Sequence, residues 1–287
     1  MTPQPALFHS SPPAELAPFV SAFVHRRESV DGGVVRIFPE LRAAIQIQAA
    51  DPYWVRARNA NARWMKTPRL AMWGPRFDWA YGYARRDIDA YGIALTPNGM
   101  RTLLPVPTSA AIGEILDLAA TEGKFAAAID PSPDEPFEAW AQRIVPALRA
   151  RFSHAREVRS FNDAVSILAT KDGGAVAEAA KAANLSERQF RRAFEEQFGV
   201  SPKRYQRALR IDRMIRRLHP RPWERDAHGE EPIAFADQPH AIREFREMTG
   251  MTPKEYAAAK SGGDRTLRSI PVSGVAPPND DGDAARY

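Results

Sequence analysis

The hydrophobic and polar positions divide the chain into two parts with different periods. Between Val34 and Leu95, short apolar runs rich in β-branched and aromatic residues are separated by Pro, Gly, Asn or Asp. This pattern predicts strands. The expected strands are residues 34–38, 43–48, 53–58, 70–73, 79–83 and 91–95. Several short strands at this spacing predict an antiparallel sandwich or small barrel.

After Leu95 the period becomes helical. Helical segments are expected at residues 98–104 and 110–120, from a loop at 130–136 to about 152 with a bend at Pro146, and at 158–170. Helical patterns then continue to about Lys260. The sequence therefore predicts an α+β fold with two domains: a β-rich, sandwich-like or barrel-like regulatory domain followed by an all-α domain.

The domain limits follow from the same pattern. The β-rich domain is expected over residues 19–150 and the helical domain over 155–260, with the change of period between 120 and 155. Residues 1–18 are punctuated by prolines and are expected to form a loose leader. Residues 261–287 are rich in Gly, Pro and Asp without periodicity, which predicts a disordered tail.

Residues 184–205 predict a capped amphipathic helix followed by the start of a second helix. Ser186 is a natural N-cap, Gln189 completes the capping-box spacing, and Gly199 supplies a left-handed C-terminal stop. Phenylalanines lie on one face and arginines on the opposite face. Such a helix has the shape and charge to enter a DNA major groove, although an ordinary solvated surface helix would look similar.

The strongest signal is an internal repeat. Shifted by 51 residues, residues 198–205 lie over residues 249–256, so that the helix end, the glycine stop, the Ser/Thr-Pro start and the tyrosine all recur. A duplicated packing unit without a nucleic-acid role is the competing interpretation. Arginine on the outer side of both copies favours nucleic-acid binding.

Two further segments fit the first copy. Residues 175–183 carry a stripe of small apolar residues, which lets a second helix cross closely, as a helix-turn-helix requires. Residues 203–218 predict a helix that joins the two copies. From Arg188 to Arg217 there are ten basic residues and three acidic ones, a balance expected for phosphate contact.

Composition narrows the function further. The chain has a formal charge of +5 and no cysteine, which excludes disulfides, thiol nucleophiles and cysteine-ligated zinc and suits a reducing cytoplasm. No apolar run is long enough to cross a membrane and the N-terminus lacks the pattern of a signal peptide, so we expect a cytoplasmic protein. The histidines lack paired ligand spacing, and no phosphate loop or nucleophile elbow occurs. We therefore predict no catalytic residue, metal or cofactor, and no enzyme activity.

Residues 176–205 and 235–256 resemble the DNA-binding domain of AraC/XylS-type transcriptional regulators. The resemblance covers about residues 158–260. It implies seven helices in two helix-turn-helix units joined by a long helix. It also implies regulation at promoters, with double-stranded DNA as the ligand and RNA polymerase as a partner.

The resemblance also implies roles for individual residues. The candidates for reading bases are Arg188, Arg191 and Arg192 on the first unit and Gln238, His240 and Arg243 on the second. The candidates for backbone contact are Lys203, Arg204, Arg207 and Lys254. One departure affects the second unit: the segment where its leading helix should lie, near 226–234, contains Gly229 and Pro232 and follows Pro220 and Pro222. Whether that helix is retained stays open.

The β-rich part carries no motif of comparable specificity. It resembles the regulatory domains attached to this family only loosely, and such domains bind a small molecule or form a homodimer. Trp54, Trp64, Trp73 and Trp79 could line a pocket, but aromatic core packing is the stronger expectation for each. Two alternatives stay open: a non-specific or architectural DNA-binding protein whose N-terminal domain only dimerises, and a β-barrel enzyme fused to a DNA-binding module.

Overall fold

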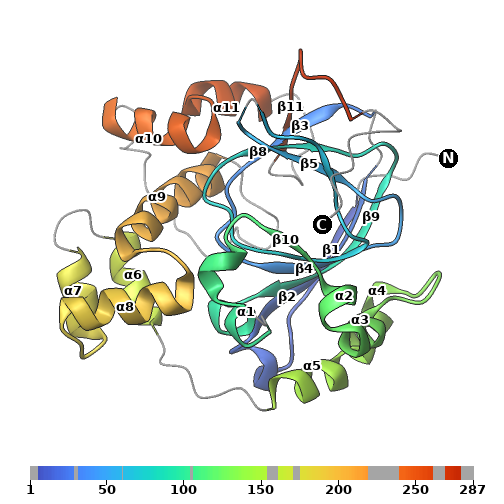
Figure 1. Cartoon of the computed structure of the whole chain (residues 1–287), viewed down its shortest axis with the longest axis horizontal. Coiled ribbons are helices and arrows are strands. Elements are labelled where there is room, and N and C mark those ends of the chain that lie inside the picture. Colours follow the sequence, from blue (N-terminus) through green and yellow to red (C-terminus); the bar gives the residue numbers. More distant parts are fainter. Residues whose placement is uncertain are drawn as a thin grey trace.

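The computed structural model describes residues 6–28, 32–59, 61–103, 106–153, 161–170, 175–218, 239–260 and 269–278. Two antiparallel sheets form most of the N-terminal part, and helices form most of the C-terminal part (Figure 1). The predicted α+β class is therefore confirmed. Each of the six predicted strand segments contains a strand.

The first sheet has six strands and lies over a layer of helices. Its strand order is β1 (Ala6–Ser10), β2 (Val20–Glu28), β9 (Ile88–Leu95), β4 (Ala44–Gln48), β7 (Leu70–Trp73) and β10 (Ile115–Asp117). The central strands alternate: in β4, Ile45 and Ile47 are fully buried on one face, while Ala44 and Gln46 lie on the other. Such alternation fixes the register of the sheet, because a slip of one residue would turn every side chain to the wrong face.

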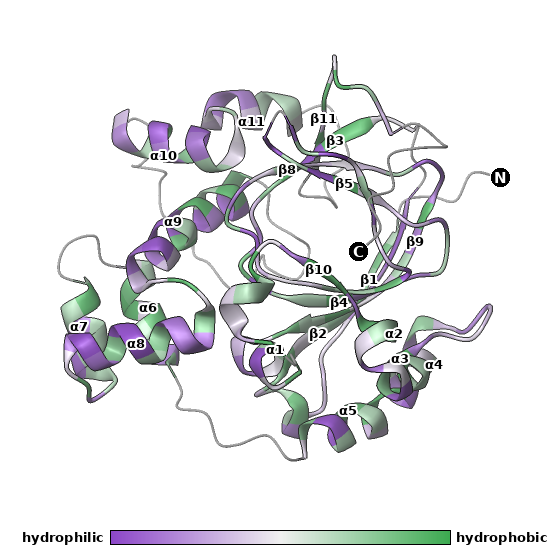
Figure 2. Ribbon diagram, viewed as in Figure 1, coloured by the Kyte–Doolittle hydropathy of each residue, from purple (hydrophilic) through white to green (hydrophobic). Residues whose placement is uncertain are grey.

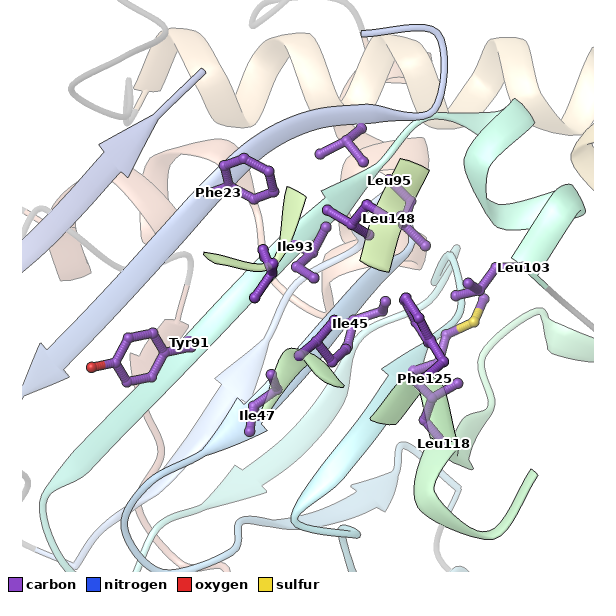
Figure 3. Close-up of a cluster of buried hydrophobic side chains, with 14 of the residues drawn as sticks. Phe23, Ile45, Ile47, Tyr91, Ile93, Leu95, Leu103, Leu118, Phe125 and Leu148 are labelled. Atoms are coloured by element: carbon purple, nitrogen blue, oxygen red, sulfur yellow. The ribbon is translucent and has the colours of Figure 1, made fainter. Parts of the chain in front are cut away.

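Five helices cover the Ile45 face of this sheet. They are α1 (Pro97–Leu103), α2 (Leu118–Thr121), α3 (Gly123–Ile129), α4 (Phe137–Arg143) and α5 (Val145–Phe152). Figure 3 shows Ile45, Ile93 and Leu95 of the sheet meeting Leu118, Phe125 and Leu148 of the helices in one buried cluster. Pro146 lies in the first turn of α5, so it separates α4 from α5 rather than bending one helix.

The second sheet has five strands and faces the first. Its order is β11 (Ser269–Pro271), β3 (Val34–Ile37), β8 (Ala80–Tyr83), β5 (Trp54–Ala57) and β6 (Met65–Lys66). The outermost strand, β11, comes from the far end of the chain and pairs with β3. Ile270 of β11 is buried, and the indole of Trp64 donates a hydrogen bond to the Ala276 carbonyl.

Three further sequence-based predictions were wrong. Residues 6–10 are not loose but form β1, which pairs along its whole length with β2, because the prolines of the leader lie outside this stretch. Residues 110–120 are not one helix: a 3-10 turn, Thr108–Ala111, precedes β10 and α2, since β10 completes the edge of the sheet beside β7. The tail contains β11 and is ordered over residues 269–278. The strands β2 and β6 and a further 3-10 turn, Ala14–Leu16, were not predicted.

The helical part contains α6 (Asn162–Thr170), α7 (Ala175–Ala182), α8 (Glu187–Phe198), α9 (Pro202–Leu218), α10 (Pro239–Thr249) and α11 (Pro253–Lys260). Its core includes Phe190, Phe194 and Phe245, and continues without a break into Phe38 and Phe77 of the β-rich part. Tyr205 and Tyr256, the tyrosines that recur in the internal repeat, are both buried in this cluster. None of the described helices is both long and apolar enough to cross a membrane.

Candidate nucleic-acid interface

The helix α8 begins and ends where the sequence predicts. The Ser186 hydroxyl accepts from the Gln189 amide nitrogen, and the Gln189 side chain accepts from the Ser186 amide at 3.1 Å, so the capping box is formed. Gly199 ends the helix with a φ of 74°. These contacts satisfy backbone groups that a helix end leaves without partners, so α8 has defined limits before any tertiary packing.

The turn before α8 places it against α7. Asn184 adopts a left-handed φ of 55°, which asparagine tolerates better than most residues, and the amide of Leu185 donates to the Ala180 carbonyl. The small side chains of Ala175, Ala179 and Ala180 are buried and let the two helices approach closely. Together, α7 and α8 have the arrangement of a helix-turn-helix.

The outer face of α8 is basic and accessible. Arg188, Arg191 and Arg192 are all exposed, and the Arg192 side chain reaches 85% exposure. Arg191 pairs with Glu187 at 2.8 Å and Arg192 with Glu196 at 3.1 Å, one turn away in each case. Exposed pairs of this kind contribute only about 0.2–1 kcal/mol, so both guanidinium groups can exchange these partners for an anionic ligand. Figure 2 shows the hydrophilic stretches of α8.

The second copy reproduces the geometry of the first. Gly250 ends α10 with the same φ of 74° as Gly199. Thr252 and Glu255 form reciprocal hydrogen bonds at the start of α11: the Thr252 amide donates to the Glu255 carboxylate, and the Glu255 amide donates to the Thr252 hydroxyl. The hydrogen bond from the Thr252 backbone is the main reason why the pKa of Glu255 is lowered. The internal repeat thus extends to backbone conformation.

The predicted residues of the second unit are only partly described. His240 and Arg243 are exposed on α10. Gln238 and the segment near 226–234, where a leading helix was in question, lie outside the described residues. The structure therefore brings together two of the three predicted base-reading residues of this unit.

The four predicted backbone-contact residues, Lys203, Arg204, Arg207 and Lys254, lie in different surroundings on α9 and α11. Lys203 and Lys254 are exposed, as backbone contacts require. Arg204 lies over the ring of Phe77, with its guanidinium carbon 5.1 Å from the ring centre. Arg207 is half-buried and pairs with Glu244 at 3.0 Å and with Glu247 at 2.8 Å, both on α10.

Glu244 is the centre of a charge cluster that the sequence did not reveal. Its side chain is 7% exposed and accepts from Arg207 and from Arg210, at 3.0 Å in each case, while His240 lies 3.4 Å away. Burial lowers the pKa of the Arg207 guanidinium, but the carboxylates of Glu247 and Glu244 outweigh this effect and raise it. The cluster ties α10 to α9, which means that part of the basic charge counted along α9 is neutralised by acids more than 30 residues away.

The C-terminal ends of α8 and α10 also contact the β-rich part. A Cβ atom at Gly199 would lie 2.9 Å from the Thr108 carbonyl oxygen, and one at Gly250 would lie 2.7 Å from the Trp79 ring. Arg36 stacks on Trp79 and donates to the Gly250 carbonyl at 2.9 Å. The N-terminal part therefore holds the C-terminal ends of α8 and α10 at the same time.

A cavity of about 360 Å³ lies between the two sheets. Its volume is within the range of small-molecule sites, near the lower end. Of the four tryptophans named as pocket candidates, Trp54 and Trp73 line the cavity. Trp64 and Trp79 do not: Trp64 is buried beside the C-terminal segment, and Trp79 packs against Gly250.

The comparisons with known proteins agree with this geometry in the helical part. Residues 179–259 match a family model described as a helix-turn-helix domain. No curated protein matches the chain. A 1.65 Å structure of ToxT from Vibrio cholerae is 11% identical, covers 82% of this chain and 98% of its own, and has a TM-score of 0.45. ToxT from the same organism with an unsaturated fatty acid bound is 10% identical, covers 82% and 94%, and has a TM-score of 0.44. Likenesses this distant assign neither an activity nor a ligand to the present chain.

Proposed function

We propose that the helix-turn-helix domain matched over residues 179–259 is of the AraC type, and that the protein uses it to bind specific DNA sequences and to regulate transcription there. One observation carries the proposal. Arg188, Arg191 and Arg192 project from a capped helix whose opposite face is buried by phenylalanines. A helix of this shape fits the major groove, where arginine reads guanine through two hydrogen bonds worth about 1–3 kcal/mol of discrimination.

The second helix-turn-helix extends the proposed contact. His240 and Arg243 of α10, with Gln238, are the proposed base-reading residues of this unit. The 17-residue helix α9 and the Glu244 cluster hold α10 in a fixed position relative to α8. Two recognition helices held in this way can read adjacent segments of one duplex when they are about one helical turn apart, roughly 34 Å.

Contact with the phosphate backbone of DNA is proposed for the exposed lysines. Lys203 and Lys254 lie at the starts of α9 and α11, where they can meet phosphates without reading sequence. Arg204 and Arg207 belong to the same proposed set. Arg207 contributes less than the lysines, because its guanidinium is already shared between two carboxylates.

Paired variants test this sorting of contacts at fixed salt concentration. Arg188→Ala should relax base preference at one position, with a loss of about 1–3 kcal/mol on the specific site. Lys203→Ala should weaken binding to all sequences about equally and reduce the slope of log affinity against log salt by about 1. Identical effects of the two variants would show that the assignment of roles is wrong.

We also propose that a small molecule bound in the N-terminal cavity controls DNA binding. Support comes from the cavity itself and from the close contacts of the β-rich part with the C-terminal ends of both α8 and α10. RNA polymerase and a second copy of the chain are the protein partners implied by the family resemblance, and the cytoplasm is the compartment in which such a regulator would act. No catalytic activity is proposed.

The main alternative is a non-specific DNA-binding protein whose N-terminal part only dimerises. Competition binding separates the two functions: a specific regulator binds its own site about 10³–10⁷ times more tightly than random DNA. Genome-wide mapping of bound DNA would identify that site. Equal affinity for the mapped site and for random DNA would exclude the specific function.

A further inference from the structure

The cavity between the two sheets is walled mainly by small and aliphatic side chains. On the six-stranded sheet, Ala44 pairs with Ala94 and Gln46 pairs with Gly92 across β4 and β9, and these positions face the cavity. On the five-stranded sheet, Val35 and Val55 flank Gly82 and face it from the other side. Small residues at facing positions leave room that larger ones would fill, so most of the wall favours an apolar ligand.

Two buried hydrogen-bond donors belong to residues that line this cavity. Among the described residues, the Trp73 indole nitrogen is buried without a hydrogen-bond partner, and the buried Tyr53 hydroxyl forms no well-aligned hydrogen bond, although the nearby Gln46 side chain interacts with it. Trp73 lies opposite Ala44 on the cavity-facing side of the sheet. Buried polar groups in proteins are nearly always paired, so donors left without a partner indicate what a bound molecule would supply. An indole nitrogen can only donate, and a ligand must therefore offer it an acceptor.

The charged groups of the wall are already neutralised. Arg26 donates to a carboxylate oxygen of Glu28 at 3.1 Å through Nε and at 2.6 Å through Nη2. Arg42 pairs with Glu40 at 3.3 Å. An anionic ligand would lose its hydration on entry and would have to compete with Glu28 or Glu40 for a counter-ion.

From these contacts we infer that the cavity binds a neutral, largely apolar small molecule whose hydrogen-bond acceptors meet Tyr53 and Trp73. The inference rests on the proposed control of DNA binding by a small molecule, and it names the chemical class of that molecule. Burial raises the pKa of Tyr53 to about 12, which keeps the phenol protonated as a donor at physiological pH.

Matched pairs of probes test the charge preference on the full chain. Methyl octanoate and octanoate differ in charge but share an alkyl chain, and methyl benzoate and benzoate provide an aromatic pair. Affinities are measured from tryptophan fluorescence and from the thermal midpoint, which rises with binding. We expect each ester to bind at least tenfold more tightly than its acid. Equal or tighter binding of the acids, or no binding of either ester, would overturn the inference.

Single substitutions test which side chains of the cavity wall contact the ester. Tyr53→Phe should weaken ester binding about threefold to tenfold, the effect of one lost hydrogen bond. Tyr81→Phe is the matched control. Tyr81 lies on β8 outside the cavity lining, so removing its hydroxyl should leave the affinity for the esters unchanged. Ala44→Leu should block the cavity and abolish ester binding while leaving the thermal midpoint without probe unchanged or higher. An equal effect of the two Tyr→Phe changes, or unchanged binding in Ala44→Leu, would place the probes elsewhere and overturn the inference.

The affinity for DNA is measured separately from the affinity for the esters. Ester binding that leaves the affinity for the mapped DNA site unchanged would retain the ligand class and reject control of DNA binding. Loss of specific DNA binding in Arg188→Ala with normal ester binding would show that the ester binds at a site separate from the DNA-contacting residues.

Discussion

Replacing Glu244 by glutamine is the most direct test of how the second recognition helix is held. The substitution keeps the size of the side chain but removes the charge that Arg207 and Arg210 share. Breaking a buried ion pair from one side generally costs about 3–5 kcal/mol, but Arg207 keeps the carboxylate of Glu247 as a partner, which reduces the cost here. The two arginine side chains are 34% and 20% exposed, so water compensates part of that loss. We therefore expect a loss of about 2 kcal/mol in the free energy of unfolding.

Urea denaturation followed by circular dichroism measures this loss as a lower midpoint at unchanged slope. The control is Glu247→Gln, which removes a carboxylate from the same Arg207 in a side chain that is 61% exposed. An exposed pair contributes about 0–1 kcal/mol, so the control should be nearly neutral. If Glu244→Gln cost no more than Glu247→Gln, the cluster would not hold α10, and our account of how the two recognition helices are fixed would be wrong.

Three further predictions concern other contacts in the fold. Gly250→Ala should destabilise more than Gly113→Ala: both residues have a positive φ, which costs about 1–2 kcal/mol with a side chain, but only at Gly250 would the new methyl group meet the Trp79 ring. Equal losses, measured by thermal unfolding, would exclude a tight contact there. The pKa of Glu135 is lowered mainly by its hydrogen bonds from Arg143, so its contribution to stability is complete above the ordinary pKa of 4.5 and is lost as pH falls through the lower folded value. Glu135→Gln should therefore flatten the fall of unfolding free energy on acidification, and an unchanged slope would contradict this. Truncation after Lys260 removes β11 with the buried Ile270 and should lower the thermal midpoint, whereas an unchanged midpoint would show that the segment contributes no stability.

Much of the candidate site could be predicted because its signals are local. The capping box of Ser186 and Gln189 and the stops at Gly199 and Gly250 involve atoms a few residues apart, and the structure reproduces them. Six of the strands (β3, β4, β5, β7, β8 and β9) were also predictable, because alternation of buried and exposed positions is a property of neighbouring residues. The assignment of individual residues to bases and phosphates stays a prediction.

Other elements depend on partners that the local sequence does not contain. Residues 115–117 lie in a stretch with a helical pattern, but pairing with β7 makes them a strand. β11 has three residues and no pattern of its own, and it forms only because β3 offers an unpaired edge. A strand this short takes its stability from the sheet that it joins.

By itself, the sequence determined the helices that carry the arginines, their limits and their duplication, since these depend on hydrogen bonds and periodicity within one or two turns. Only the tertiary structure decided where those helices are held. Arg36 donates to the carbonyl of Gly250 across 214 residues, and Glu244 neutralises arginines of another helix. Contacts between residues so far apart in the chain leave no periodic trace, because their geometry is set by the packing of the whole core rather than by neighbouring residues.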